Sequence, residues 1–405
     1  MLRSNKMTKK ILFWIVFLIA ITQLTVILFQ HREELTKRDY SIRYNSLKSL
    51  YYASQYVRKN NPIIITDEAF EAFASGVFLT GLNPIYIVHD HPPLGRYIIA
   101  LSIIIFDNEK TIPAFLLIIS VIGIFLISCM IIKNQVFAVI PVGILINEPL
   151  FLTKFTVLPL GEAIQLSFII FAIYLFLLSW KTKHWPIFLS VNILIGAVVS
   201  IRYFILGVAL WGACALFLLI KRNYNKLLVL VFSSPLILII LFASYTKTIL
   251  DGYTLRQILG IQKYIFAYHQ SAFVLPFSFW DLLLFNRWHT WWGTNAISSD
   301  PQWQILWPVS VLLAAVGGVL AVFKKLQVSD EEAFLYLWII AYSAMLSFGY
   351  SSTRYFLPLL PFLYILGCKC VIRLLQFFPN PPAGVNIKNR SEIHRKKARR
   401  CQLLT

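Results

Sequence analysis

The stretch "IPAFLLIISVIGIFLISCMII", residues 112–132, contains no charged residue. A helix needs roughly 20 apolar residues to cross about 30 Å of hydrocarbon. This stretch is therefore long enough to span a bilayer, and similar apolar runs recur along most of the chain. The pattern predicts an all-α, polytopic membrane protein.

The composition supports this class. Hydrophobic residues make up 58% of the 405 residues and charged residues only 14%, whereas a soluble domain is usually about half apolar and about a quarter charged. A net charge of +19 also occurs in nucleic-acid-binding proteins, but we interpret the lysines and arginines as cytoplasmic anchors of the spans. The first apolar run is too long for the apolar region of a typical signal peptide, so we expect an uncleaved span.

Ten spans are expected, at residues 11–29, 112–132, 136–152, 158–179, 186–201, 204–220, 227–245, 304–323, 333–349 and 355–375. Alternating them from a cytoplasmic N-terminus places the basic connections "KTKHW" and "KRNYNK" inside, as the positive-inside rule requires. Both termini are then cytoplasmic, and the loops 30–111 and 246–303 are extracytoplasmic. The short pair in 186–220 leaves the count open there. We expect one transmembrane domain, 1–375, and a basic cytoplasmic tail, 376–405.

Both long loops contain segments suited to the membrane surface. The first includes "EELTKRDYSIRYNSLKSLYYASQYVRK", which predicts an interfacial amphipathic helix whose lipid-facing residues are Leu47, Leu50, Tyr51 and Tyr52. The second includes "FSFWDLLLFNRWHTWWG", whose tryptophans favour the headgroup level. The five cysteines all fall in spans or in the tail, so we expect no disulfide.

An acidic cluster and a proline turn stand out in the first loop. "TDEAFEAF", residues 66–73, predicts a helix start that Thr66 or Asp67 caps. Acids in a first turn also complement the helix dipole, so a purely structural role is the alternative. "HDHPPLGR", residues 89–96, leads into an apolar stretch, which predicts that His91 and Arg96 lie at headgroup depth. Cations at that depth suit a phosphate.

An Asp-Glu pair followed by "HPPLGR" before an apolar helix resembles the GT-C membrane glycosyltransferases. The resemblance is strongest to the protein O-mannosyltransferases (dolichyl-phosphate-mannose-protein mannosyltransferases), which carry lysine where this chain has Arg96. The bacterial aminoarabinose transferases, with Lys-Pro-Pro-Leu at this place, are similar. Two more stretches support the resemblance, "EPLFLTKFTVLPLGEAIQLSF" at 148–168 and "RYFLPLLPFLYIL" at 354–366.

The resemblance implies an inverting glycosyltransferase. It would move a sugar, mannose or similar, from a polyprenyl-phosphate carrier to a hydroxyl of a protein, lipid or polysaccharide acceptor at the outer face of the membrane. It implies that Asp67 is the base and that Glu68 orients the acceptor or the sugar. The candidate ligands of the donor phosphate or sugar are His91, Arg96, Lys154, Glu162, Arg202, Arg354 and Tyr355. No nucleotide is needed, which agrees with the lack of a P-loop or Rossmann glycine pattern.

Other interpretations of these residues remain open. Glu162 pairs with Arg202 or Lys154, or acts in the site, and Arg202 could instead snorkel to outer headgroups. The resemblance implies no cofactor, but a divalent metal could be held by histidines and acids of the first loop, namely His89, His91, Asp67 and Glu68. The second loop has aromatic residues that either line an acceptor groove or anchor the loop, namely His269, Trp288 and His289. The alternative functions are a lipid-linked glycan transporter or flippase and a non-catalytic relative.

Overall fold

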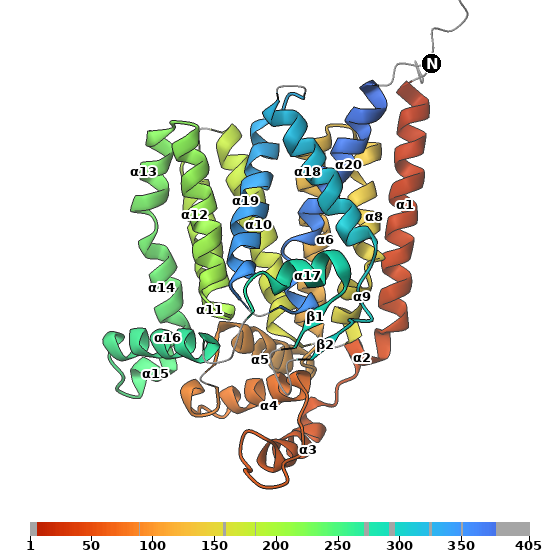
Figure 1. Ribbon diagram of the computed structural model, residues 1–405. Coiled ribbons are helices and arrows are strands. Elements are labelled where there is room, and N and C mark those ends of the chain that lie inside the picture. Colours follow the sequence, from red (N-terminus) through yellow and green to blue (C-terminus); the bar gives the residue numbers. More distant parts are fainter. Residues whose placement is uncertain are drawn as a thin grey trace, which may run out of the picture.

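The computed structural model describes residues 6–88, 90–156, 159–182, 184–270, 275–290, 296–323, 326–349 and 351–377. His89, Lys183 and nearly all of the predicted tail lie outside the described residues. The described part of the chain is mostly helical, with one small antiparallel sheet of β1 (Trp288–His289) and β2 (Ile297–Ser298). Figure 1 shows an upright helix bundle with the shorter helices gathered at one end.

The upright helices coincide with the predicted spans. The unbroken ones are α1 (Lys6–Gln30), α6 (Thr111–Ile132), α10 (Gly161–Lys181), α11 (Pro186–Ile201), α12 (Ile205–Ile220), α18 (Leu306–Val322), α19 (Asp330–Ser347) and α20 (Leu360–Phe377). Within the described residues, four helical segments are long and apolar enough to cross a membrane, namely Phe13–Gln30, Thr111–Ile132, Gly161–Lys181 and Tyr224–Ser244. Other apolar helices are shorter. The chain is a helical membrane protein, and the number of ten spans stays a prediction.

Two predicted spans are interrupted. The segment 136–152 is divided into α7 (Gln135–Ala138), α8 (Ile140–Ile146) and the start of α9 (Pro149–Thr156), and the segment 227–245 into α13 (Tyr224–Phe232) and α14 (Pro235–Ser244). Prolines account for the breaks, because proline lacks an amide hydrogen and clashes with the preceding helical turn. Pro149 begins α9 and Pro235 begins α14. A prediction of spans from the length of apolar runs alone does not detect these interruptions.

The first long loop folds into five short helices, α2 (Arg32–Thr36), α3 (Tyr40–Ala53), α4 (Asp67–Leu79), η1 (Pro84–Tyr86) and α5 (Leu94–Phe106). The predicted interfacial helix forms as α3, but two of the four residues that were predicted to face lipid are buried in the protein. Tyr51 is buried and stacks on Phe73 of α4 at a ring separation of 4.5 Å, and Leu47 is buried in the same cluster. Leu50 and Tyr52 are exposed. Aromatic residues on α4 offer α3 a protein surface on which to bury its apolar side.

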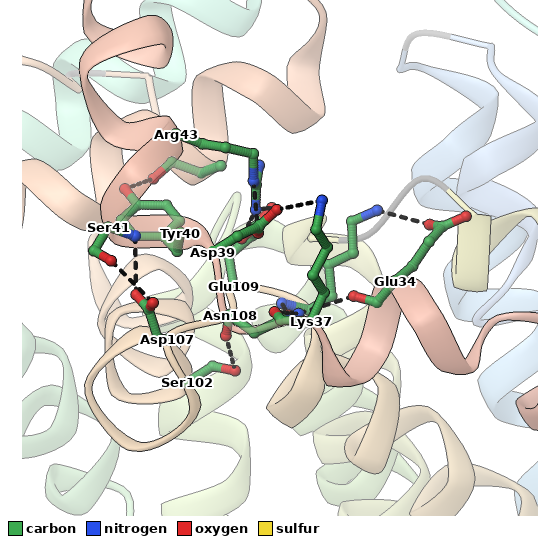
Figure 2. Close-up of polar contacts among 12 residues, drawn as sticks. Glu34, Lys37, Asp39, Tyr40, Ser41, Arg43, Ser102, Asp107, Asn108 and Glu109 are labelled. Carbon is green, nitrogen blue, oxygen red and sulfur yellow. Dashed lines mark hydrogen bonds and ion pairs between the residues drawn. The ribbon is translucent and has the colours of Figure 1, made fainter.

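Figure 2 shows how the beginning of this loop is tied to its end. Arg43 of α3 reaches the buried carboxylate of Glu109 at 2.7 Å and Asp39 at 2.8 Å. The backbone amide and hydroxyl of Ser41 both donate to the carboxylate of Asp107 at 2.9 Å. These contacts join the start of α3 to the connection between α5 and α6, so the loop closes on itself and the positions of α4 and α5 are fixed.

Glu109→Gln is expected to loosen this closure. Glutamine keeps the size of the side chain but loses the charge that Arg43 contacts, and hydrogen bonds to charged groups contribute about 1.5–3 kcal/mol. The expected result is faster backbone hydrogen exchange in α3, with the free energy of local opening lowered by about the same 1.5–3 kcal/mol. The matched control is Glu33→Gln on the exposed side of α2, which should leave exchange in α3 unchanged. Equal exchange in both variants would contradict the anchoring role.

The second long loop meets the first at the same end of the bundle (Figure 1). It contains α15 (Thr246–Leu250), α16 (Leu255–Gln270) and α17 (Ser278–Phe285) before the small sheet. One side of α16 is buried through Ile258 and Ile265, while Leu255 and Leu259 are exposed. The end of α16 contacts the first loop, because the His269 imidazole lies 3.2 Å from the carbonyl oxygen of Asp90.

Candidate active site

The acidic cluster begins helix α4. Thr66 is the N-cap, and its hydroxyl accepts a hydrogen bond from the amide of Ala69 at 3.4 Å. Of the two caps that the sequence allowed, Thr66 is therefore the one that forms. Asp67 and Glu68 lie in the first turn, where the helix dipole favours carboxylates. The Asp67 side chain is 54% exposed, so its carboxylate can reach groups outside α4.

Arg354, in the short helix η2 (Thr353–Phe356), connects this helix start to the transmembrane bundle. Its Nη1 donates to Oδ2 of Asp67 at 2.8 Å, and its Nε lies 3.5 Å from Oε1 of Glu162. The guanidinium also lies over the ring of Tyr355, 5.4 Å from its centroid. Burial acts to lower the pKa of Arg354, but Tyr355, Glu162 and Asp67 together raise it above its usual value. Arg354 is thus a fixed cation between two carboxylates.

Glu162, in the first turn of α10, is also paired with Arg202, the residue that follows α11. The sequence left open whether Arg202 pairs with Glu162 or extends to lipid headgroups. In the structure, Arg202 faces Glu162. Lys154 of α9 is buried and forms no ion pair with a described residue. Burial lowers the pKa of Lys154, and the nearby Glu162 opposes this effect.

A cavity of about 420 Å³ opens beside these charges. One part of its wall is polar and includes the predicted residues His91, Glu162, Arg202, Arg354 and Tyr355. The rest is largely apolar and comes from α12, α16, α19 and the segment before α20, with the residues Ile205, Leu206, Phe266, Tyr342, Met345, Leu346, Phe348, Leu357 and Pro358. A charged end combined with an apolar wall suits a molecule that has an anionic head and a hydrocarbon tail.

Arg96 does not line this cavity. It is only 3% exposed, and its Nε and Nη2 each lie 2.9 Å from a carboxylate oxygen of Glu71. Its guanidinium also lies 5.6 Å from the ring centroid of Phe70. Burial raises the pKa of Glu71, and Arg96 opposes this shift. As placed, Arg96 connects α5 to α4, and its predicted contact with a donor phosphate stays a prediction.

His91 lies at the cavity beside Asp90 and His269, neither of which was predicted as a ligand of the donor. Its Nδ1 is 3.1 Å from Oδ2 of Asp90, and its ring centroid is 5.3 Å from that of His269. His269 lines the cavity, whereas His289 and Trp288, which were considered with it, do not. Burial, together with the neighbouring His91, lowers the pKa of His269 to about 4. The imidazole of His269 is therefore neutral at pH 7, and Nε2 donates to the carbonyl oxygen of Asp90.

Metal binding by the first loop stays a prediction. Among the described residues, no group of three or more histidines, cysteines and acids is arranged to hold an ion. His89, one of the ligands considered, lies outside the described residues. Charged contacts between side chains account for the acids that are buried at the site, such as Glu162 and Glu71.

Known proteins share this arrangement of helices. A family model described as dolichyl-phosphate-mannose-protein mannosyltransferase matches residues 90–246, a segment that includes His91, Glu162 and Arg202. Two solved structures of ArnT from Cupriavidus metallidurans, one bound to undecaprenyl phosphate and one in the apo state, match with TM-scores of 0.55 and 0.56. Each is 13% identical in sequence, and the matches cover 83% and 82% of this chain. The chain has the same overall fold as these ArnT structures.

The chain spans about three-fifths of the ArnT chains, since the matches cover 61% and 60% of them. No curated protein matches the sequence. Asp67, Glu68, Arg354 and Tyr355 lie outside the segment that the family model matches. Their place in the site therefore rests on the geometry. Arg354 and Tyr355 line the cavity, whereas Asp67 and Glu68 do not, and Asp67 reaches the edge of the cavity through its contact with Arg354.

Proposed function

We propose that the chain is an inverting glycosyltransferase that takes a sugar, mannose or similar, from a polyprenyl-phosphate carrier. The donor tail would lie along the apolar wall of the cavity, between α12 and α19. Its phosphate would lie at the polar end, near Arg202 and Arg354. Arginine forms strong charge-assisted hydrogen bonds with phosphate, and two arginines at one end of an apolar cavity support a lipid phosphate over a soluble nucleotide sugar.

The acceptor hydroxyl attacks the anomeric carbon from the side opposite the phosphate. A new carbon–oxygen bond forms, the bond between the anomeric carbon and the phosphate oxygen breaks, and the configuration inverts. Asp67 takes the hydroxyl proton, and the bond electrons leave on the lipid phosphate. A positioned base contributes about 10² to 10⁴ in rate, and fixed cations that stabilise developing charge are usually a larger effect.

The contact between Arg354 and Asp67 carries this proposal. Arg354 lies 2.8 Å from Asp67 and 3.5 Å from Glu162, and Glu162 in turn holds Arg202. The base and the phosphate-binding arginines thus belong to one connected set of charges at the edge of the cavity. Glu68, one residue beyond Asp67, would orient the acceptor or the sugar, and Lys154 would add positive charge behind Glu162.

The direct test uses vesicles that contain the purified full chain. Radiolabelled sugars on polyprenyl phosphate are supplied one at a time with extracts that contain protein, lipid or polysaccharide acceptors. Transfer that needs the lipid-linked donor and that proceeds with a sugar nucleotide absent supports the proposal. If the chain moves the intact lipid-linked sugar across the bilayer and transfers nothing, the proposal fails in favour of a transporter.

The proposal also requires the site to face outward and both termini to lie inside. In a cysteine-free background, Thr80→Cys and Ser299→Cys should react with an impermeant thiol reagent in intact cells. Tyr224→Cys, at an exposed position between α12 and α14, should react only after the membrane is permeabilised. A cysteine at Lys183 should behave like Tyr224→Cys. Labelling of Tyr224→Cys in intact cells would place the site on the wrong side.

A further inference from the structure

Asp90 and His91 form a carboxylate–imidazole pair at the edge of the cavity. The ring Nδ1 of His91 lies 3.1 Å from Oδ2 of Asp90, and the His91 side chain is about 10% exposed. A carboxylate next to one ring nitrogen fixes the orientation and the tautomer of an imidazole. In this arrangement Nδ1 faces the Asp90 carboxylate at ion-pair distance, and Nε2 is the ring nitrogen left for contacts with a cavity ligand.

The Asp90 carboxylate has a second charged neighbour, Arg96. Arg96 Nη2 lies 3.8 Å from Oδ1 of Asp90, while the guanidinium is fixed by its two contacts with Glu71. Burial acts to raise the pKa of the Asp90 carboxyl, but His91 and Arg96 hold this pKa well below its usual range. Asp90 is therefore an anion at every physiological pH, and its position is set by both α4 and α5.

Charged groups of opposite sign lie on the two sides of the His91 ring. On the cavity side, Arg202 and Arg354 disfavour a further cation, while Glu162 partly offsets them. On the other side lie the carboxylates of Asp90 and Glu71, which favour a cation on His91. The guanidinium of Arg96 lies between these two carboxylates and partly offsets them. Among the described residues, other titratable neighbours of this group include His269, Tyr56 and Tyr245. Burial raises the pKa of Tyr56, so the two tyrosines and the neutral His269 add no charge. Asp90 is thus the anion in direct contact with the ring.

We propose that Asp90 is a positioning residue that makes His91 a phosphate ligand. With Nδ1 donating to Asp90, His91 donates from Nε2 to the phosphate of the lipid donor. A histidine that donates from both nitrogens is the imidazolium cation, so a third cation joins Arg202 and Arg354 when phosphate is bound. Arg96 and Glu71 hold Asp90 in place and do not touch the phosphate. This inference rests on the proposed polyprenyl-phosphate donor.

The test is the pH dependence of prenyl-phosphate binding. Farnesyl phosphate is titrated against the full chain in lipid nanodiscs between about pH 5.5 and about pH 8.5, a range across which histidine changes charge. The second ionisation of the phosphate, near about pH 6, is the same for every variant and cancels in the comparison. Asp90→Asn should bind farnesyl phosphate about as well as the natural chain at the acid end and about tenfold more weakly at the alkaline end.

The chain offers a matched control pair. Asp281 and His289 form a second Asp–His contact, at 2.9 Å, and neither residue lines the cavity. Asp281→Asn should leave the pH profile of binding unchanged. A second variant, His91→Lys, supplies a cation that needs no carboxylate to stay charged. Binding by His91→Lys should vary little over the pH range, and adding Asp90→Asn to it should change little.

The outcomes separate this inference from the proposed function. If the natural chain binds no farnesyl phosphate, the donor site and this inference both fail. If the natural chain binds but Asp90→Asn shows the same pH profile, only the role of Asp90 is overturned. A uniform loss of affinity at all pH values in Asp90→Asn, with no rescue by His91→Lys, would also overturn it, because that pattern reports damage to the fold.

Discussion

Asp67→Asn is expected to reduce sugar transfer by about 10² to 10⁴-fold while leaving expression and donor binding intact. Asparagine has the same size but cannot accept the proton of the acceptor hydroxyl, and general base catalysis contributes about this much. The helix start survives the change because Thr66, and not Asp67, caps α4. The measurement is the initial rate of transfer from polyprenyl-phosphate sugar in vesicles, at saturating donor.

Two variants frame this result. Glu68→Gln should be milder if Glu68 only orients the acceptor or the sugar. Asp251→Asn, in the second loop and paired with Lys247, removes an acid remote from the cavity and should transfer at the natural rate. If Asp67→Asn retains a nearly normal rate, the base has been assigned to the wrong residue, and Glu68 becomes the first candidate.

Arg354→Ala is expected to reduce transfer by about 10² to 10³-fold, the usual effect of removing one fixed donor from a developing negative charge. The loss has two sources in the structure. The departing phosphate loses a cation, and Asp67 and Glu162 lose the group that lies between them. Arg354→Lys should recover only part of the rate, because a lysine ammonium cannot reproduce the planar, two-sided contacts of a guanidinium.

The control for Arg354 is Arg287→Ala. Arg287 lies in the second long loop, is exposed and does not line the cavity, so its loss should leave both rate and donor affinity unchanged. Arg96→Ala is expected to differ from both, because Arg96 is buried against Glu71. Arg96→Ala should affect the thermal stability of the chain more strongly than its affinity for the donor. Equal donor dependence in Arg354→Ala and the natural chain would remove Arg354 from the site.

The transmembrane part of the fold was predictable because its signal is local. Apolar length identifies a crossing helix without reference to the rest of the chain, and helices lie at each predicted span. The breaks at Pro149 and Pro235 were missed because the window of apolar residues runs through them. The burial of Tyr51 on α3 was missed for a different reason, since the aromatic surface of α4 that covers it comes from another segment of the loop.

The sequence allowed the residues of the candidate site to be named, but only some of the contacts between them could be predicted. The sequence singled out Asp67, Glu162, Arg202 and Arg354, but the alternation of spans could not show that Arg354 contacts both carboxylates. Arg96 was expected to face a phosphate because its turn leads into an apolar stretch and was predicted to lie at headgroup depth. Its actual partner, Glu71, lies four residues after Asp67 on α4, and sequence spacing does not reveal which acid a buried arginine will meet.

The ion pair between Arg354 and Asp67 joins residues that are 287 positions apart in the chain. A ribosome that adds about 5–20 residues per second needs about 15–60 s to cover that distance. Throughout this interval Asp67 already exists and its cationic partner does not. Under the proposed function, the chain therefore gains activity only after its final helices are made, and a chain that terminates before Arg354 has the first loop but lacks the partner of Asp67.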